Sequence, residues 1–236
     1  MKEKELEVIY EDNHLLVVNK PAGMLVQGDK TGDVPLVEHG KAYIKEKYQK
    51  PGAVFLGVVH RLDRPVSGAV VLARTSKALG RMSELFRQND VKKTYWAVVR
   101  QRPYDPEGSL THWLVKDTTR NIAKAHNKPV KGGKEATLSY KLLAESNGFY
   151  LLEIHPLSGR PHQIRVQLAS MGCPIRGDVK YGFDRPNEDG NINLHARCLE
   201  FVHPVKKQSL SLFAELPQDD FWQLFRNFAA EEKYNG

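Results

Sequence analysis

The chain has 236 residues, of which 41% are hydrophobic and 27% charged, and its formal net charge is +7. This composition is typical of a globular protein, and no apolar run is long enough for a membrane-spanning helix. The polar start lacks the apolar core of a signal peptide. Only Cys173 and Cys198 occur, which argues against a disulfide scaffold or a thiolate zinc site. These features predict a cytoplasmic protein.

The positive charge is concentrated in one segment. Residues 91–134 contain ten basic and three acidic residues, a balance that equals the net charge of the whole chain. A solvated basic loop would explain an isolated patch. The concentration in a single segment favours a track for a polyanion instead.

The first part of the sequence predicts short strands and two helices. Pro and Gly in Lys20-Pro21-Ala22-Gly23 break the chain after a strand, and Pro51-Gly52 ends a helix. Apolar residues at helical spacing follow Ser76, a residue typical of an N-cap. The predicted strands are residues 6–10, 15–19, 55–59 and 69–73, and the predicted helices are residues 34–50 and 76–89.

The remaining elements are again mostly strands in neighbouring pairs. Pro161 suits the first position of a helix and Gly172 its C-terminal end. We expect an α+β fold, with a large mixed, mainly antiparallel sheet and flanking helices, in a single domain of residues 1–236. The further predicted strands are residues 94–99, 136–142, 149–154, 199–202 and 210–213, and a closing helix is predicted at residues 219–230.

Two charged segments carry the candidate chemistry. HRLDRPVSGAVVLA, residues 60–73, places Asp63 between two arginines where a strand ends, and HPLSGRPHQIRVQL, residues 155–168, carries Arg165. In the second segment the apolar stripe leaves Arg165 about 100° away from Ile164, where it can face a cleft. An arginine facing a buried carboxylate lowers its pKa by roughly 1–3 units and keeps it ionised as a nucleophile. The simpler interpretation of Asp63 is a surface ion pair.

HRLDRPVSGAVVLA resembles the catalytic motif of the RluA-type pseudouridine synthases. Four further pieces resemble motifs of that family, in family order from about residue 17 to residue 196: VVNKPAGMLV, KKTYWAVV, LSGRPHQIRVQLASMGCPIRGDVKYG and Leu194-His195-Ala196. The resemblance covers most of the chain. It implies a pseudouridine synthase catalytic domain with a central RNA-binding cleft.

The resemblance also implies roles for individual residues. Asp63 would be the catalytic nucleophile or base acting on uridine, and Tyr95 would stack on the base and assist proton transfer. Arg165 would ionise and orient Asp63, while Arg61 would enter the helix stack where the target uridine leaves it. Isomerisation consumes no group and changes no oxidation state, so no cofactor and no metal are expected.

We expect further RNA contacts around this site and along the basic segment. His60 and His162 are expected near the cleft as hydrogen-bonding supports. The predicted RNA-binding residues are Arg61, His60, Arg160, His162, Gln163, Lys92, Lys93, Lys124, Lys128, Lys131 and Lys134. The expected partner is ribosomal or transfer RNA, with no membrane and with a monomeric enzyme favoured.

Some positions depart from the family pattern. Val66, Ser158 and Pro161 replace threonine, and Gln167 replaces histidine. None of them is one of the proposed catalytic residues, so we interpret them as subgroup variation. Many relatives carry an N-terminal S4-type RNA-binding domain, and the eighteen residues before Asn19 are too few for one.

Two other functions compete with an RNA-modifying isomerase. One is a non-catalytic RNA-binding or assembly factor on the same fold, acting through the basic segment. The other is a hydrolase that uses Asp63 on a glycosidic bond. The hydrolase is weakened because such enzymes usually need two carboxylates.

Overall fold

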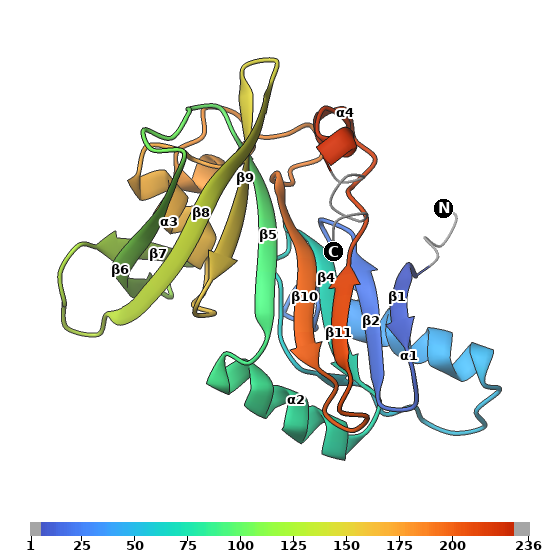
Figure 1. The fold of residues 1–236 in the computed structure, drawn as a ribbon. Coiled ribbons are helices and arrows are strands. Elements are labelled where there is room, and N and C mark those ends of the chain that lie inside the picture. The colour runs from blue at the N-terminus through green and yellow to red at the C-terminus, as the bar shows by residue number, and fades with distance from the viewer. Residues whose placement is uncertain (1–5, 229–236) are drawn as a thin grey trace. The chain divides into compact units, whose positions relative to one another are not determined.

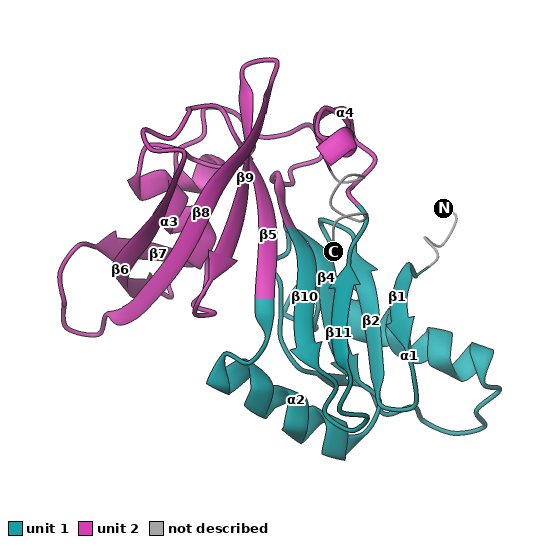
Figure 2. Ribbon diagram, viewed as in Figure 1, with its two compact units in different colours: residues 1–92, 196–215 teal, residues 93–195, 216–236 magenta. Residues whose placement is uncertain are grey.

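The computed structural model describes residues 6–228, and its contacts divide the chain into two compact units (Figures 1 and 2). Unit 1 comprises residues 1–92 and 196–215, and unit 2 comprises residues 93–195 and 216–236. The chain changes unit within two strands, β5 (Lys92–Val99) and β10 (Leu194–Val202). The single domain expected from the sequence stays a prediction.

Unit 1 is built on strands in the order β1-β2-β4-β10, with β3 paired to β4 and β11 paired to β10. The registers of the pairs β1–β2, β2–β4, β3–β4 and β10–β11 are antiparallel. Its elements are β1 (Val8–Glu11), β2 (Leu15–Lys20), α1 (Leu36–Lys47), β3 (Gly57–Val58), β4 (Ser67–Ala73), α2 (Ser76–Gln88) and β11 (Ser209–Phe213).

A helix covers each face of this sheet. On one face Val17 and Val71, which lie opposite each other in register, pack in a cluster with Met82 of α2. On the other face α1 approaches so closely that a Cβ at Gly40 would lie 3.5 Å from side-chain atoms of both Leu16 and Leu72. Because both faces are covered, β2 and β4 are continuous apolar runs without alternation.

Unit 2 contains an antiparallel sheet in the order β5-β9-β8-β6-β7. Asp219 caps α4 by accepting hydrogen bonds from the backbone of Phe221 and Trp222. The further elements of unit 2 are β6 (Glu107–Asp117), β7 (Ile122–His126), β8 (Lys134–Ser146), β9 (Phe149–Pro156), α3 (Gln163–Ser170), the 3₁₀ helix η1 (Val179–Tyr181) and α4 (Asp220–Gln223).

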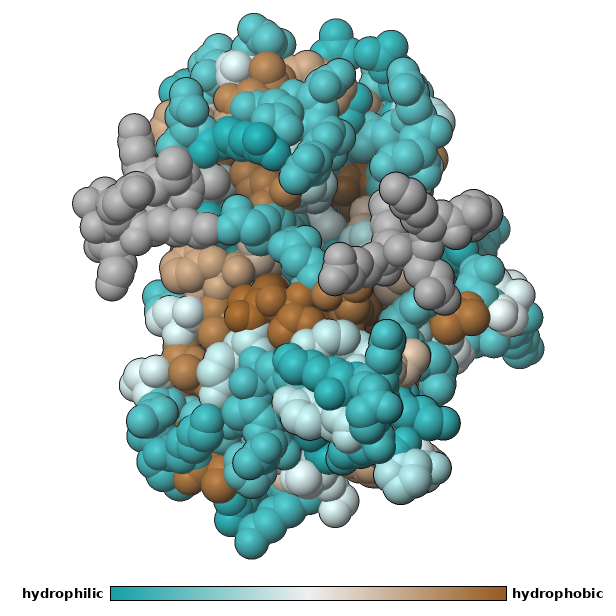
Figure 3. All heavy atoms as spheres, turned by 90° about the vertical axis from the view of Figure 1, so that its right-hand side faces the viewer, coloured by the Kyte–Doolittle hydropathy of each residue, from teal (hydrophilic) through white to brown (hydrophobic). Residues whose placement is uncertain are grey.

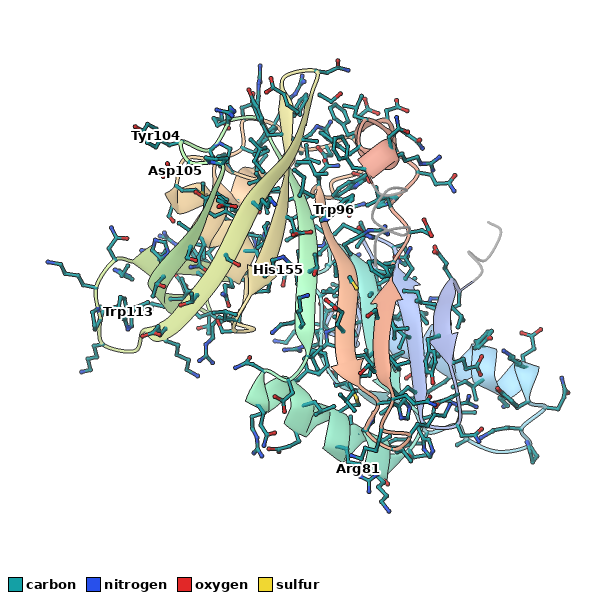
Figure 4. All side chains as sticks on the ribbon, in the orientation of Figure 1. Arg81, Trp96, Tyr104, Asp105, Trp113 and His155 are labelled. Atoms are coloured by element: carbon teal, nitrogen blue, oxygen red, sulfur yellow. The ribbon has the colours of Figure 1, made fainter. Side chains whose placement is uncertain are left out.

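The two faces of the unit 2 sheet differ in what covers them. Val166 of α3 packs against Ala136, which by alternation shares a face with Tyr140. On the opposite face Trp96, labelled on β5 in Figure 4, packs with Trp222 of the C-terminal segment. The sheet therefore has an α3 face and an α4 face.

The α+β, mainly antiparallel fold expected from the sequence is confirmed, but some local details differ from the predictions. Strands β6 and β7 lie in the basic segment, where no strand was predicted between residues 99 and 136. Helix α3 begins at Gln163, after His162 in a left-handed conformation with φ 55°, and not at Pro161. The predicted closing helix is interrupted: α4 ends at Gln223, a turn follows at residues 224–225, and residues 226–228 are again helical. The end of the predicted helix, residues 229–230, lies outside the described residues.

Polar side chains dominate the part of the surface seen in Figure 3. Among the exposed large side chains, Tyr104 stands out with 96% of its surface accessible, and Figure 4 shows it projecting from the β5–β6 connection. In the described part of the chain no helix is both long and apolar enough to span a bilayer.

Candidate active site

Asp63 lies half-buried on the connection between β3 and β4, and hydrogen bonds hold the backbone around it in place. The N–H of Val66 donates to the carbonyl of Asp63 at 3.1 Å. Gly23 and Arg64 exchange two hydrogen bonds, from Gly23 N to Arg64 O at 2.8 Å and from Arg64 Nε to Gly23 O at 3.0 Å. The turn after β2 thus holds the loop that carries Asp63.

Lys20 strengthens the same connection from inside unit 1. Its side chain is fully buried, and Nζ donates to the carbonyls of Pro21, Met24 and Arg64 at 3.0, 2.8 and 3.3 Å. Burial lowers the pKa of Lys20 to about 7, and the charge of Asp63 acts in the opposite direction. Lys20, the last residue of β2, therefore ties the turn that follows β2 to the loop that carries Asp63.

His60 supports the loop from its other end. Its Nε2 accepts the backbone N–H of Val71 at 3.0 Å, and its ring stacks on Phe86 with 4.4 Å between centroids. His60 is thereby a structural support, and its predicted RNA contact stays a prediction. Arg61, next in the chain, is exposed and forms no hydrogen bond or ion pair with any residue of the described range 6–228.

Arg165 forms a buried two-pronged ion pair with Asp178. Its Nε and Nη2 donate to Oδ2 and Oδ1 of Asp178 at 2.7 and 2.8 Å, and the two residues are only 5% and 1% exposed. The sequence predicted Asp63 as the partner of Arg165. Asp178 was assigned no role, although Asp178 belongs to the GDVKYG end of the motif that contains Arg165. The Asp63–Arg165 pairing stays a prediction, because the two residues belong to different units.

Tyr181 extends this pair into a cluster. Its hydroxyl accepts the backbone N–H of Ala123 at 2.7 Å and lies 2.7 Å from Nδ1 of His162, to which it can donate its proton. The guanidinium of Arg165 lies 5.1 Å from the centroid of the Tyr181 ring. His162 and Tyr181 therefore hold the start of α3 and the side chain of Arg165 in one arrangement.

The loop before α3 is held in the same way. Gln163 donates to the carbonyl of Thr137 at 3.1 Å and accepts from the hydroxyl of Ser158 and the backbone N–H of Arg160. Gln163 is 4% exposed and therefore serves to hold the loop before α3 in place. Arg160, in contrast, is exposed. The RNA contacts predicted for His162, Gln163 and Arg160 stay predictions.

Helix α3 differs from the amphipathic helix expected. All six residues 163–168 are buried, so Arg165 does not lie on an open face of the helix. The reason is that β6, β7 and η1 all contact α3. Tyr95 is half-buried on β5 and lies opposite Ile154, which in turn lies opposite Tyr140, so its side chain points to the α3 face.

The basic residues divide into two environments. Lys92 is exposed and pairs with Glu200 at 2.8 Å, whereas Lys93 is buried. Four further lysines are exposed on β7, on the β7–β8 connection and at the start of β8: Lys124, Lys128, Lys131 and Lys134. Within residues 6–228, no three His, Cys, Asp or Glu side chains are grouped as for a metal ion.

Comparison with known proteins places this chain among the enzymes that isomerise uridine in RNA to pseudouridine. The chain belongs to the RNA pseudouridylate synthase family, whose model matches residues 14–170. It is therefore an isomerase with RNA as its partner, and the alternative of a non-catalytic RNA-binding factor is not favoured.

Curated relatives and solved structures agree with this assignment. The chain is 32% identical to the tRNA pseudouridine synthase C of Vibrio parahaemolyticus, over 97% of both proteins. It is 34% identical to the ribosomal large subunit pseudouridine synthase C of Vibrio cholerae, over 91% of this chain and 68% of that protein. The structure of human RNA pseudouridylate synthase domain containing 4 is similar with a TM-score of 0.77 and 25% identity, over 94% of this chain and 93% of that one.

Proposed function

We propose that this enzyme converts uridine to pseudouridine in transfer or ribosomal RNA in the cytoplasm. Relatives named for each kind of RNA are similar to it, and those that the chain covers over 97% of their length are named for transfer RNA. Transfer RNA is therefore the first substrate to test. We further propose that residues 1–236 act as one catalytic domain with a central RNA-binding cleft, as a monomer and without a metal or cofactor.

Asp63 is proposed as the reactive carboxylate. The N1–C1′ bond of the uridine breaks, the base turns, and C5 becomes bonded to C1′, while the proton of C5 is lost and N1 gains one. No oxidant or reductant is needed. The carboxylate of Asp63 either forms a covalent adduct or assists elimination at the sugar. Tyr95 stacks on the base and assists the proton transfer, and Arg165 orients the carboxylate.

The pinned loop around Asp63 is the observation that carries this proposal. Hydrogen bonds hold the loop at Arg64 and Val66, and His60 anchors its other end. Such restraint lowers the cost of bringing a reactive group into position. A surface aspartate with only a solubility role would need no such support.

RNA binding is proposed to use both units. Arg61 has its donors unoccupied within the described chain and would enter the stack from which the uridine is extruded. Extrusion from a duplex costs a few kcal/mol, and stacking on an aromatic ring returns roughly 1–3 kcal/mol. The exposed lysines of β7, β8 and their connection would neutralise phosphates.

Nucleoside analysis tests the proposal. The purified protein is incubated with unmodified transcripts of transfer RNA and of large-subunit ribosomal RNA, and the digested RNA is examined for pseudouridine and free uracil. Pseudouridine in one of the RNAs supports the proposal. Free uracil without pseudouridine would indicate a hydrolase, and binding without either product would indicate a non-catalytic RNA-binding protein.

A further inference from the structure

Lys93 is a buried cation that no residue of the described chain neutralises. It is 9% exposed, and within residues 6–228 its ammonium group forms no hydrogen bond and no ion pair. Burial lowers the pKa of Lys93, and no opposing charge compensates. A cation taken from water without a partner weakens the folded state. The structure itself gives Lys93 no stabilising role.

Lys20 and Lys93 are the two buried lysines of the described range, and they differ in their partners. The ammonium group of Lys20 donates hydrogen bonds to three backbone carbonyls. The fold therefore provides partners where a buried lysine serves the fold. Groups that burial leaves unsatisfied are typical of functional sites, where a ligand supplies the missing partner.

The position of Lys93 on β5 indicates what that ligand is. Lys93 and Tyr95 are two residues apart on one strand, so both side chains leave the same face of the sheet, about 7 Å apart at the backbone. Thr94 and Trp96 point to the opposite face: Thr94 contacts His155, and Trp96 packs on the α4 face. Lys93 thus stands beside the aromatic ring on which the target base is proposed to stack.

An ammonium group has three donors and no acceptor, so its partner is an acceptor, and an anion fits best. In RNA the anionic group is the phosphodiester, which one ribose separates from the base. We propose that Lys93 binds a backbone phosphate of the nucleotide whose base stacks on Tyr95. This inference rests on the proposed function and names the group that anchors the extruded nucleotide. Contacts to phosphates position RNA without selecting its sequence.

Two matched variants separate this role from general electrostatic attraction. Lys93→Met and Lys141→Met each remove one positive charge from the sheet of unit 2, but Lys141 is exposed on β8 and has no proposed role in RNA binding. With a transcript in which pseudouridine forms, Lys93→Met is expected to lower the rate at saturating RNA by roughly ten- to hundredfold, the range of a charge-assisted hydrogen bond. Lys141→Met should keep the wild-type rate. Equal rates in the two variants would overturn the inference.

Thermal unfolding excludes a merely structural role. Because Lys93 is buried without a partner, Lys93→Met should unfold at the wild-type temperature or above it. Lys93→Arg keeps the charge and should restore part of the rate. A Lys93→Met protein that unfolds several degrees lower, with its rate lost, would show that Lys93 supports the fold and would overturn the inference.

A substrate variant identifies the phosphate. The 5′ or the 3′ phosphate of the target uridine is replaced by an uncharged methylphosphonate in a synthetic oligonucleotide. One of the two replacements should slow the wild-type enzyme. The same replacement should not slow the Lys93→Met variant any further, because that variant has already lost the contact. Additive effects at both positions would mean that Lys93 does not contact either phosphate.

A spectroscopic measurement keeps this inference separable from the proposed function. The pH titration of the Lys93 side chain is followed by carbon-13 NMR at Cε, with Lys93→Arg to assign the signal. Saturation with a transfer RNA transcript should raise the titration midpoint, because a bound phosphate favours the charged amine. The result requires no turnover. An unchanged midpoint in RNA that the protein isomerises would refute the phosphate contact while leaving the proposed function intact.

Discussion

The guanidinium group of Arg165 and the carboxylate of Asp178 face each other through two hydrogen bonds of 2.7 and 2.8 Å in a part of unit 2 that water scarcely reaches. Two-pronged pairs fix the plane of the guanidinium as well as its position. Asp178 therefore determines which way Arg165 can present its remaining N–H groups. For an arginine that is proposed to orient a catalytic carboxylate, a fixed guanidinium plane keeps the contact in the productive geometry.

Arg165→Met is expected to lose nearly all activity and to destabilise the protein. The substitution leaves Asp178 buried and unpaired, which costs about 3–5 kcal/mol in comparable buried pairs. Denaturant unfolding measures the loss of stability, and the rate of pseudouridine formation measures the loss of activity. Arg165→Lys should also lose much of the rate, because lysine cannot reproduce the two-pronged contact.

The double variant Arg165→Met, Asp178→Leu separates the two effects. Replacing both partners removes the unpaired charge, so stability should return close to the wild-type value. Activity should remain lost, since the arginine is still absent. A double variant that regains activity together with stability would restrict Arg165 to a structural role.

Asp63→Asn should abolish turnover and leave RNA affinity nearly unchanged. The amide keeps the shape of the side chain but can neither attack the sugar nor take a proton. The loop is held by backbone contacts and by Arg64, so thermal unfolding should stay within a few degrees of wild type. Pseudouridine formed by the purified variant at a measurable rate would refute the assignment of Asp63.

Neutralising the four exposed lysines, Lys124, Lys128, Lys131 and Lys134, should weaken RNA binding without changing the saturated rate. Each phosphate contact contributes about 0.7 to the slope of log K against log salt for single strands, so three contacts change it by roughly 2. Binding titrations at several salt concentrations measure the slope. Parallel salt plots for the variant and the wild type would mean that these lysines only solubilise the sheet edge.

Gly68→Ala is expected to destabilise unit 1. Gly68 has φ 117°, and a Cβ there would lie 2.5 Å from the backbone nitrogen of Ala196 on the neighbouring strand β10. Backbone strain and overpacking together should cost about 2–5 kcal/mol. Gly80→Ala is the matched control, because Gly80 lies in α2 with open space around it and should gain about 0.5–1 kcal/mol. Thermal unfolding of both variants tests this contrast.

Acidification should weaken the junction between the β1–β2 turn and the β10–β11 turn. Asp12 contacts Nε2 of His203 at 3.1 Å and Nζ of Lys206 at 2.8 Å. Burial raises the pKa of Asp12, but hydrogen bonds from Lys206 and the backbone outweigh it and hold the pKa well below its usual range. Burial also lowers the pKa of His203.

Both shifts mean that the unfolded chain binds more protons at these groups, so stability rises with pH. The contribution of His203 should fade as the pH drops below about 6.5, and that of Asp12 below about 4. Unfolding measured from pH 8 to pH 3 should show this decline. Asp12→Asn should be less stable at pH 7 and flatter below pH 4, and identical pH curves would contradict the assignment.

The sequence predicted the elements whose patterns are local. The run Leu15–Val18 and the strand at residues 69–73 have few alternatives to buried strands, and Thr75 caps α2 one residue before the predicted cap. Strands β6 and β7 were not predicted from the sequence, because few of their residues are buried and polar residues interrupt the apolar alternation. The partner of Arg165 could not be predicted, since Asp178 lies thirteen positions further along the chain, beyond the end of α3 and a connecting segment.

The division of unit 1 between residues 1–92 and 196–215 has a consequence for biosynthesis. During translation β4 leaves the ribosome without β10, the neighbour it has in the finished sheet, because more than a hundred residues of unit 2 are made in between. The strands β5 to β9 are consecutive in the sequence, so their sheet can form without any strand that is made later. We expect the later-made sheet to form first, while the open edge of β4 depends on rapid completion of the chain or on a chaperone.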